Sequence, residues 1–236
     1  MNVDNPNDLP RLRESIIACR KCPRLVEHRE SVSREKRKAF IDWTYWGRPV
    51  PGFGDPGAQL VIIGLAPAAH GGNRTGRVFT GDPSASFLMR GLHEAGFANQ
   101  PTSESRDDGL RLLNAYMTAA VRCAPPGNRP TSEEVRNCAP YLWRELDILH
   151  PKSLLVLGRL AFDAAMAYLG DRYGVRKKAA TFRHGAVYRF SEEAPVLFVS
   201  YHPSPRNTQT GLLKRESFQD LLARVREDIE DRTPSR

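Results

Sequence analysis

Residues 58–67 read AQLVIIGLAP, a short apolar run rich in β-branched residues that ends in glycine and proline. This composition is typical of a buried parallel strand that runs directly into its loop. The loop at residues 68–82 is long, and Pro83 and Ser84 then mark the start of a helix that Gly96 ends. The segment thus predicts one strand, loop and helix unit of an α/β protein.

The same alternation continues to the end of the chain. Further apolar runs predict strands at residues 116–122, 153–158, 186–190 and 196–201. The segments between and after them predict helices at residues 131–149, 160–170 and 213–231. We therefore expect an open, mostly parallel sheet with helices on both faces. Residues 34–57, rich in Trp, Pro and Gly, are expected to form a loop wrapped on this body.

Length and composition favour one globular domain over residues 1–236. Hydrophobic residues make up 40% of the chain, which argues against a disordered or fibrous protein. No apolar run is long enough to span a bilayer, so no membrane partner is expected. The first residues, MNVDNPNDLP, lack the positive start and apolar stretch of a signal peptide, which predicts a cytoplasmic location.

Charge points toward a polyanionic partner. The chain has 35 Lys and Arg against 27 Asp and Glu, a net charge of +8. Residues 11–38 hold ten of the basic side chains and only four acids. Any basic face should therefore draw on the N-terminal segment, where the run REKRK at residues 34–38 is either a DNA contact or an ordinary solvated surface.

Four cysteines are too few for a disulfide-stapled scaffold, which favours a reducing compartment. Cys19 and Cys22 form a C-x2-C pair, and Cys123 and Cys138 stand 15 positions apart. Two nearby and two distant thiolates can close a tetrahedral metal site that pins the N-terminal segment, about residues 11–57, to the core. Zinc and a [4Fe-4S] cluster both accept four cysteines, and the alternative is that the thiols simply pack in the core.

In open parallel sheets, ligands bind beyond the carboxyl ends of the strands. Three loops at those ends are unusual: GLAPAAHGGNRTGRVFTGD after the first strand, RCAPPGNRP after the second and YHPSPRNTQTG after the last. The first is neither a Walker A loop, because it lacks G-x4-G-K-[ST], nor a dinucleotide-binding loop, because its glycines are wrongly spaced. These loops should converge on one site.

These three loops and the four cysteines together resemble the uracil-DNA glycosylase superfamily, and within it family 5, the type-5 or UDGb enzymes. The resemblance covers the chain from Cys19 to the final helix. Leu65 and Ala66 stand where sister families carry an acid or amide, which separates this chain from those branches. The resemblance implies a three-layer α/β/α sandwich around a mostly parallel four-stranded sheet, a [4Fe-4S] cluster, and excision of uracil from duplex DNA by a monomeric base excision repair enzyme.

The resemblance also assigns roles by motif. Asp82 would hold the attacking water, Asn128 would lie near the flipped nucleotide, and His202 would donate to uracil O2. Phe79 would stack on the base, while Gly64, Leu65 and Ala66 would contact its edge. The cluster ligands would be Cys19, Cys22, Cys123 and Cys138.

Each assignment competes with an ordinary structural role. Asp82 can cap the helix that follows it, Asn128 suits its turn for backbone reasons, and Phe79 can be a core aromatic. His202 can be a satisfied structural histidine. Arg206 and Gln209, in the loop after His202, are candidates to fill the gap that a flipped nucleotide leaves.

The chemistry fits these residue types. Cleaving an N-glycosidic bond creates a cationic sugar and an anionic base, so a carboxylate near the sugar and fixed donors near O2 both lower the barrier. The motif loops contain no lysine, so water is the expected nucleophile. A pocket with few side-chain amides should accept hypoxanthine and ethenocytosine as well as uracil. The rival functions are a metal-stabilised nucleic-acid-binding module without catalysis and a zinc-dependent nucleotide-processing enzyme.

Overall fold

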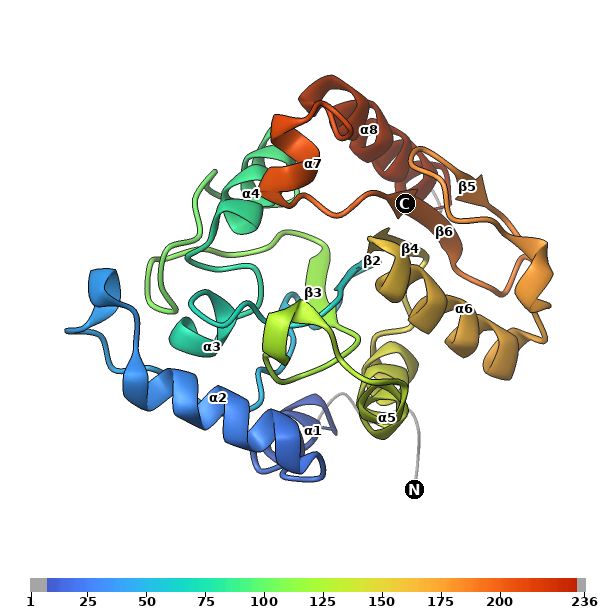
Figure 1. Ribbon diagram of the computed structural model, residues 1–236. Coiled ribbons are helices and arrows are strands. Elements are labelled where there is room, and N and C mark those ends of the chain that lie inside the picture. The colour runs from blue at the N-terminus through green and yellow to red at the C-terminus, as the bar shows by residue number, and fades with distance from the viewer. Residues whose placement is uncertain (1–7, 233–236) are drawn as a thin grey trace.

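A six-stranded sheet forms the centre of the computed structural model, which describes residues 8–232 (Figure 1). The strand order is β1-β3-β2-β4-β6-β5. The four inner strands are mutually parallel, five residues long and buried throughout: β2 (Leu60–Gly64), β3 (Ala115–Ala119), β4 (Ser153–Leu157) and β6 (Val196–Ser200). The prediction that the chain's first residues carry no signal peptide falls largely on residues 1–7, which lie outside the described part.

The expected four-stranded sheet is the inner part of this larger sheet. Two short strands, β1 (Phe53–Gly54) and β5 (Val187–Tyr188), pair antiparallel with β3 and β6 and close the two edges. The strand predicted over residues 186–190 contains β5, whereas β1 has only two residues, too few to give an alternating hydrophobic pattern. The mostly parallel four-stranded centre is confirmed, and β1 and β5 extend it at its edges.

Helices cover both faces of the sheet, as the α/β/α prediction requires. Alternate strand residues separate the two cores: Ile62 and Phe198 pack on one side, and Val61 and Val199 on the other. The first core is covered by α4 (Pro83–Glu94) and α8 (Arg215–Asp231), and the second by α5 (Ser132–Leu149) and α6 (Arg159–Tyr173). Shorter helices lie in the connecting loops: α3 (Gly72–Thr75), α7 (Pro205–Gln209), η1 (Lys38–Phe40), η2 (Pro126–Asn128) and η3 (Lys177–Ala179). Across residues 8–232, no helix has the length and apolar character needed to cross a membrane.

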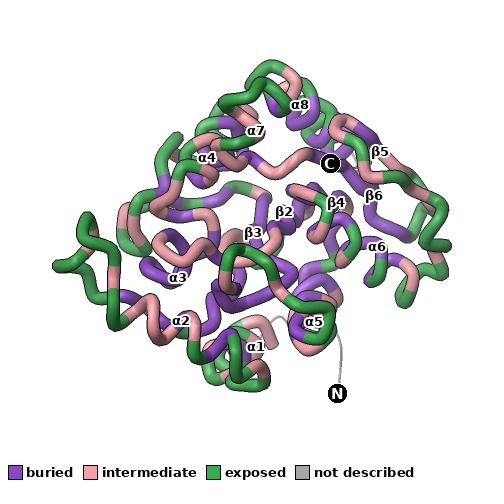
Figure 2. The backbone as a smooth tube through the Cα atoms, in the orientation of Figure 1, coloured by how far each residue is buried: buried purple, intermediate pink, exposed green. Residues whose placement is uncertain are grey.

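The N-terminal segment contains two helices that the sequence patterns did not indicate, α1 (Asp8–Ile17) and α2 (Pro23–Glu35). Their surfaces are largely polar, and Figure 2 shows how much of them is exposed. Ion pairs fasten them to α5, with Asp8 bound to Arg144 and Arg24 bound to Glu134 at 2.7 Å. The segment after α2 wraps over the body as expected, and returns to the sheet at β1.

A buried ion pair joins the loop after β3 to α5. Arg122 and Glu145 are each 1% exposed, and their side chains meet at 2.6 Å. Thr118 also donates to Glu145 at 2.5 Å, so the carboxylate is satisfied from two directions. Because Arg122 directly precedes Cys123, this network fixes the backbone that carries one of the cysteines.

Candidate active site

A cavity of about 290 Å³ opens at the carboxyl ends of the inner strands. The loops after β2, β3 and β6 all contribute to its wall. This is the expected place for a ligand site, because β3 and β4 lie on opposite sides of β2, and parallel sheets bind ligands beyond the carboxyl ends of their strands at such a point. The lining residues are Leu65, Ala66, Pro67, Ala68, Val78, Phe79, Asp82, Ser84, Ala119, Asn128, His202, Ser204 and Pro205. Three of the unusual loops therefore do converge on one site.

Asp82 begins α4 and also faces the cavity. Its Oδ1 accepts hydrogen bonds from the backbone N–H groups of Ser84 and Ala85 at 3.0 and 3.1 Å, so it caps the helix. Its Oδ2 faces Gly71, where a Cβ atom would lie only 2.3 Å from that oxygen. Burial raises the pKa of Asp82 above its usual value, against the effects of the two backbone bonds and the Arg74 charge. Asp82 therefore does cap α4. Only Oδ1 is used for the cap, so Oδ2 is left for a further role.

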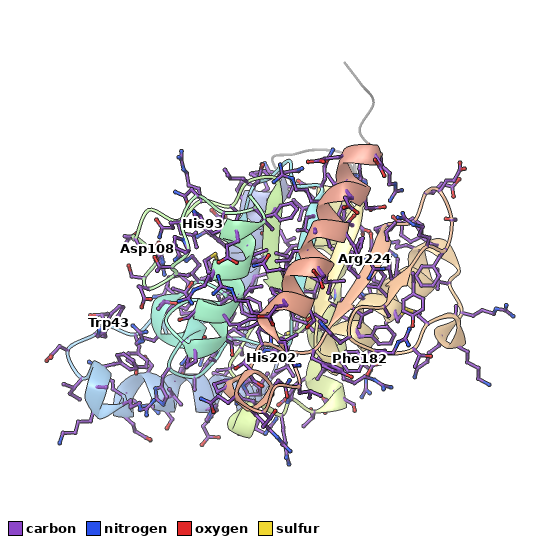
Figure 3. All side chains as sticks on the ribbon, turned by 90° about the horizontal axis from the view of Figure 1, so that it is seen from above. Trp43, His93, Asp108, Phe182, His202 and Arg224 are labelled. Carbon is purple, nitrogen blue, oxygen red and sulfur yellow. The ribbon has the colours of Figure 1, made fainter. Side chains whose placement is uncertain are left out.

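His202 also lines the cavity, at the start of the segment that leads into α7 (Figure 3). Asn207 of α7 donates to the His202 carbonyl at 2.8 Å, and a Cβ at Gly158 would lie 3.2 Å from the His202 Cβ. Burial lowers the pKa of His202, which favours the neutral ring at pH 7. A neutral imidazole in this place can donate one hydrogen bond to a ligand.

Phe79 forms an aromatic wall beside His202, with the ring centroids 6.4 Å apart. Its φ of 47° lies in the left-handed region, which a bulky residue rarely adopts. The ring packs over the end of β2, where a Cβ at Gly64 would lie 2.6 Å from it. Phe79 thus touches the core and also lines the cavity, while Gly64 shapes the wall without lining it.

Asn128 reaches the cavity from the other side, at the end of η2. It is exposed and has a φ of 56°, a conformation that asparagine tolerates better than most residues. Leu65 and Ala66 supply an apolar wall, whereas Arg206 and Gln209 lie exposed on α7 outside the lining. Six of the nine predicted active-site residues therefore line the cavity, and Gly64, Arg206 and Gln209 do not.

Three polar residues of the first loop point inward and hold its shape. Asn73, Arg74 and Arg77 are 0%, 3% and 2% exposed. Arg77 pairs with Asp108 at 2.7 Å and donates to Thr80 at 2.9 Å. These bonds explain why a loop so rich in glycine adopts one conformation.

Sequence reasoning missed two residues of the site and one exposed apolar residue in the turn after α7. Ser84 and Ser204 both line the cavity, but serines at helix starts carry no signal beyond capping. Leu212, in the turn after α7, is 55% exposed although the next residue, Leu213, is buried. An apolar residue in a loop rich in polar residues is the signal that could have marked Leu212.

The four cysteines gather between the N-terminal helices and the loop after β3. All four are free thiols, Cys123 and Cys138 buried and Cys19 and Cys22 half-buried in the turn between α1 and α2. Burial raises the pKa of Cys123 to about 12; the Arg29 charge opposes this shift, and the other three thiols reinforce it. The thiols therefore lie within electrostatic reach of one another.

The surroundings of the thiols are suited to an anionic group. Arg29 is 2% exposed; its guanidinium pairs with Glu30 at 3.6 Å and donates to the Gly47 carbonyl at 2.6 Å, whereas its Nε atom has no hydrogen-bond partner. Thiolate ligands beside this buried cation would therefore be stabilised by its charge. Within residues 8–232, no three His, Cys, Asp or Glu side chains are grouped tightly enough to hold one metal ion.

An α/β/α sandwich with such a cavity at its carboxyl edge belongs to a known class. The family model of the uracil DNA glycosylase superfamily matches residues 51–226, and this chain belongs to that family. It is 53% identical over 210 residues to the type-5 uracil-DNA glycosylase of Thermus thermophilus, covering 89% of this chain and 93% of the relative. It is 46% identical over 213 residues to the type-5 enzyme of Pyrobaculum aerophilum, covering 90% of each chain.

The type-4 branch is more distant. The type-4 uracil-DNA glycosylase of Pyrobaculum aerophilum is 30% identical over 219 residues, covering 92% of each chain. The higher identity to the type-5 enzymes confirms the resemblance to family 5 that the motifs indicated. The family match also confirms the α/β/α fold class.

Proposed function

We propose that this protein is a monofunctional uracil-DNA glycosylase, which flips a uracil nucleotide out of DNA and hydrolyses its N-glycosidic bond. One observation carries the proposal: a carboxylate and an aromatic ring from the loop after β2 and a neutral imidazole from the loop after β6 line one base-sized cavity. A nucleic-acid-binding module without catalysis would gain nothing from that convergence. The type-5 relatives, which cover nine tenths of the chain, support the same activity.

The reaction follows from the positions of Asp82 and His202. The bond between C1′ and N1 breaks, its electron pair leaves with the base, and the sugar becomes cationic. Water held by Oδ2 of Asp82 adds its oxygen to C1′, and its proton passes to the carboxylate and finally to the base. The neutral His202 ring donates to O2 while negative charge develops there, an interaction worth roughly 3 to 4 kcal/mol.

The cavity wall sets the substrate range. Leu65, Ala66 and Ala68 are apolar, and Asn128 is the only amide side chain in the lining. A wall with few fixed donors discriminates weakly between bases. We therefore propose that hypoxanthine, and also ethenocytosine, are excised in addition to uracil opposite guanine.

The turn around α7 is suited to contact duplex DNA. Opening a base pair costs a few kcal/mol and leaves a gap in the stack. Arg206, Gln209 and Leu212 are exposed on this turn, next to the cavity-lining Pro205. We propose that the substrate is duplex DNA and that these side chains fill the gap, with Leu212 as the apolar wedge.

We also propose that the four cysteines bind a [4Fe-4S] cluster. Cys19, Cys22, Cys123 and Cys138 are within electrostatic reach of one another, and a polynuclear cluster holds its thiolates farther apart than a single ion does. Bound there, the cluster would supply a structural cross-link between α1, α2 and the body. Because all four ligands come from protein, the site offers no open position for zinc-dependent catalysis.

Single-turnover excision tests the proposal. Duplexes with U·G, hypoxanthine·T and no damage are incubated with excess wild-type protein, Asp82→Ala and His202→Ala. We expect base release by the wild type from the first two duplexes only, and loss of release with retained binding in both variants. Binding without release by the wild type would favour the non-catalytic module. We also propose that the protein acts as a monomer.

A further inference from the structure

The segment between α2 and the body projects from the side of the molecule. This segment, residues 36–46 and called here the basic finger, extends past α3 in Figure 1, and its tip is exposed in Figure 2. Ile41 and Trp43 at the tip are 55% and 36% exposed. Figure 3 places Trp43 at the edge of the molecule. Large apolar side chains held in solvent in this way need an explanation.

The finger is rigid at its tip. Lys36 has a φ of 52° and donates from Nζ to the Ile41 carbonyl at 2.9 Å, which closes the turn. Phe40 and Trp43 meet edge to face with centroids 6.3 Å apart. The exposed residues are thus presented in a fixed shape.

Two cations of the finger are available to a partner. Arg37 and Lys38 are exposed, and neither forms an ion pair with any residue in the range 8–232. The acids nearest in the chain are Glu35, which accepts a bond from Ser31, and Asp42. The finger therefore presents net positive charge.

Arg74 joins the finger to the wall of the cavity. Its guanidinium lies 4.0 Å from the ring centroids of both Phe40 and Trp43, between the two rings. The same guanidinium donates to the carbonyls of His70 at 2.7 Å and Gly81 at 3.1 Å. Gly81 directly precedes Asp82, so one buried arginine holds both the aromatic pair and the catalytic loop.

Further bonds fix the base of the finger to the same loop. Tyr45 Oη lies 3.1 Å from Nδ1 of His70, and the Trp46 N–H donates to the Arg74 carbonyl at 2.9 Å. The finger and the loop that carries Asp82 therefore form one body, and a ligand bound to one is positioned against the other.

We propose that the basic finger binds the phosphate backbone of duplex DNA beside the flipped nucleotide, through Arg37 and Lys38, with Ile41 and Trp43 against the sugar edge. This inference rests on the proposed function. A duplex whose nucleotide enters the cavity extends beyond it on both sides, and it carries about one negative charge per 1.7 Å. Unpaired cations on an arm built onto the catalytic loop are complementary to that polyanion.

The salt dependence of binding tests the finger. The Arg37→Gln/Lys38→Gln double variant is compared with wild type on an undamaged duplex and on a U·G duplex. The control is Lys177→Gln/Lys178→Gln in η3, which removes the same charge beyond α6, on the side opposite the finger in Figure 1. We expect the slope of log K against log salt to become shallower by about 2 in the finger variant only.

Phosphate ethylation interference on the undamaged duplex then identifies the contacts. Ethylation of the phosphates that the finger contacts should weaken binding by the wild type and by the control variant. It should not weaken binding by the finger variant, which no longer contacts those phosphates. Equal changes of the salt slope in the two variants would mean that only the total charge of the protein matters. An unchanged slope in both variants would mean that the finger faces solvent or a protein. Either result overturns the proposal. Because these readouts use undamaged DNA, they remain decisive even if the wild type excises no base.

Discussion

Asp82 combines two positions in one residue: its Oδ1 caps α4, and the side chain lines the cavity, with Oδ2 beside Gly71 and free of the cap. A sequence motif cannot separate capping from a role in the cavity, because an aspartate before the proline suits both of them. A substitution can separate them, since asparagine caps helices as well as aspartate but carries no charge.

Asp82→Asn should therefore reduce single-turnover excision by about 10²-fold or more while leaving the melting temperature unchanged. Thr131→Ala is the matched control, because Thr131 caps α5 away from the cavity. It should cost about 1 kcal/mol of stability and leave excision intact. Full activity in Asp82→Asn would show that the residue is only a cap.

The pH dependence of excision should have an acid limb set by Asp82. Burial raises the pKa of Asp82, so the carboxylate is protonated, and activity lost, at a higher pH than for an ordinary aspartate. His202 has a lowered pKa, so it is neutral above about pH 6.5 and contributes no change between pH 7 and 8. Single-turnover rates from pH 4 to 8 check this, and a rate that rises on acidification would require a cationic His202 instead.

The lowered His202 pKa also has a consequence for stability. Because the folded state disfavours the cation, the unfolded chain binds the proton more readily. The free energy of unfolding should therefore fall as pH drops through about 6.5, and His202→Gln should reduce that dependence. Urea unfolding at several pH values measures the difference between the two proteins.

At the scale of elements, the inner strands and the four covering helices could be predicted because each has a strong apolar pattern. The strand predicted over residues 186–190 contains β5. β1 could not be predicted, since two residues have no period, and α1 and α2 could not, since they are largely polar and are held to α5 by ion pairs. Motif loops predicted which residues meet at the cavity. They could not show that Phe79 needs a left-handed backbone or that Leu212 stands exposed.

The end of β2 controls the aromatic wall. Gly64→Ala would place a Cβ 2.6 Å from the Phe79 ring and force the ring out of its position. We expect kcat/KM for U·G duplexes to fall by about 10-fold, the value of one lost aromatic stacking contact. Gly57→Ala before β2 is the control, because its Cβ would meet only Asp55 at 3.5 Å. Equal activity in the two variants would contradict the assigned role of Phe79.

At the scale of the whole molecule, the cysteines lie where the N-terminal helices meet the body. The two cores on either side of the sheet are large, whereas α1 and α2 bury only Ile16, Leu25, Val26 and Arg29. Such a small buried surface contributes little stability by itself. The attachment of this segment should therefore depend on what the cysteines bind.

Removal of the proposed cluster tests this dependence. Protein purified without oxygen should be brown, and chelation after oxidation should bleach it and make residues 18–57 sensitive to protease while the sheet stays protected. Cys22→Ser should show the same pattern without treatment. Bleaching that leaves the protease pattern unchanged would show that the cluster does not hold the segment.

The two short edge strands have a consequence for the protein in a crowded cell. Parallel sheets form slowly because their strands are far apart in the chain, and an open edge during that time can pair with another molecule. β1 and β5 each present only two residues in an antiparallel pairing at the outer edges. Once β1 and β5 have formed, neither edge of the sheet offers a long strand with which another molecule could pair. The short edge strands therefore protect the folded sheet from aggregation.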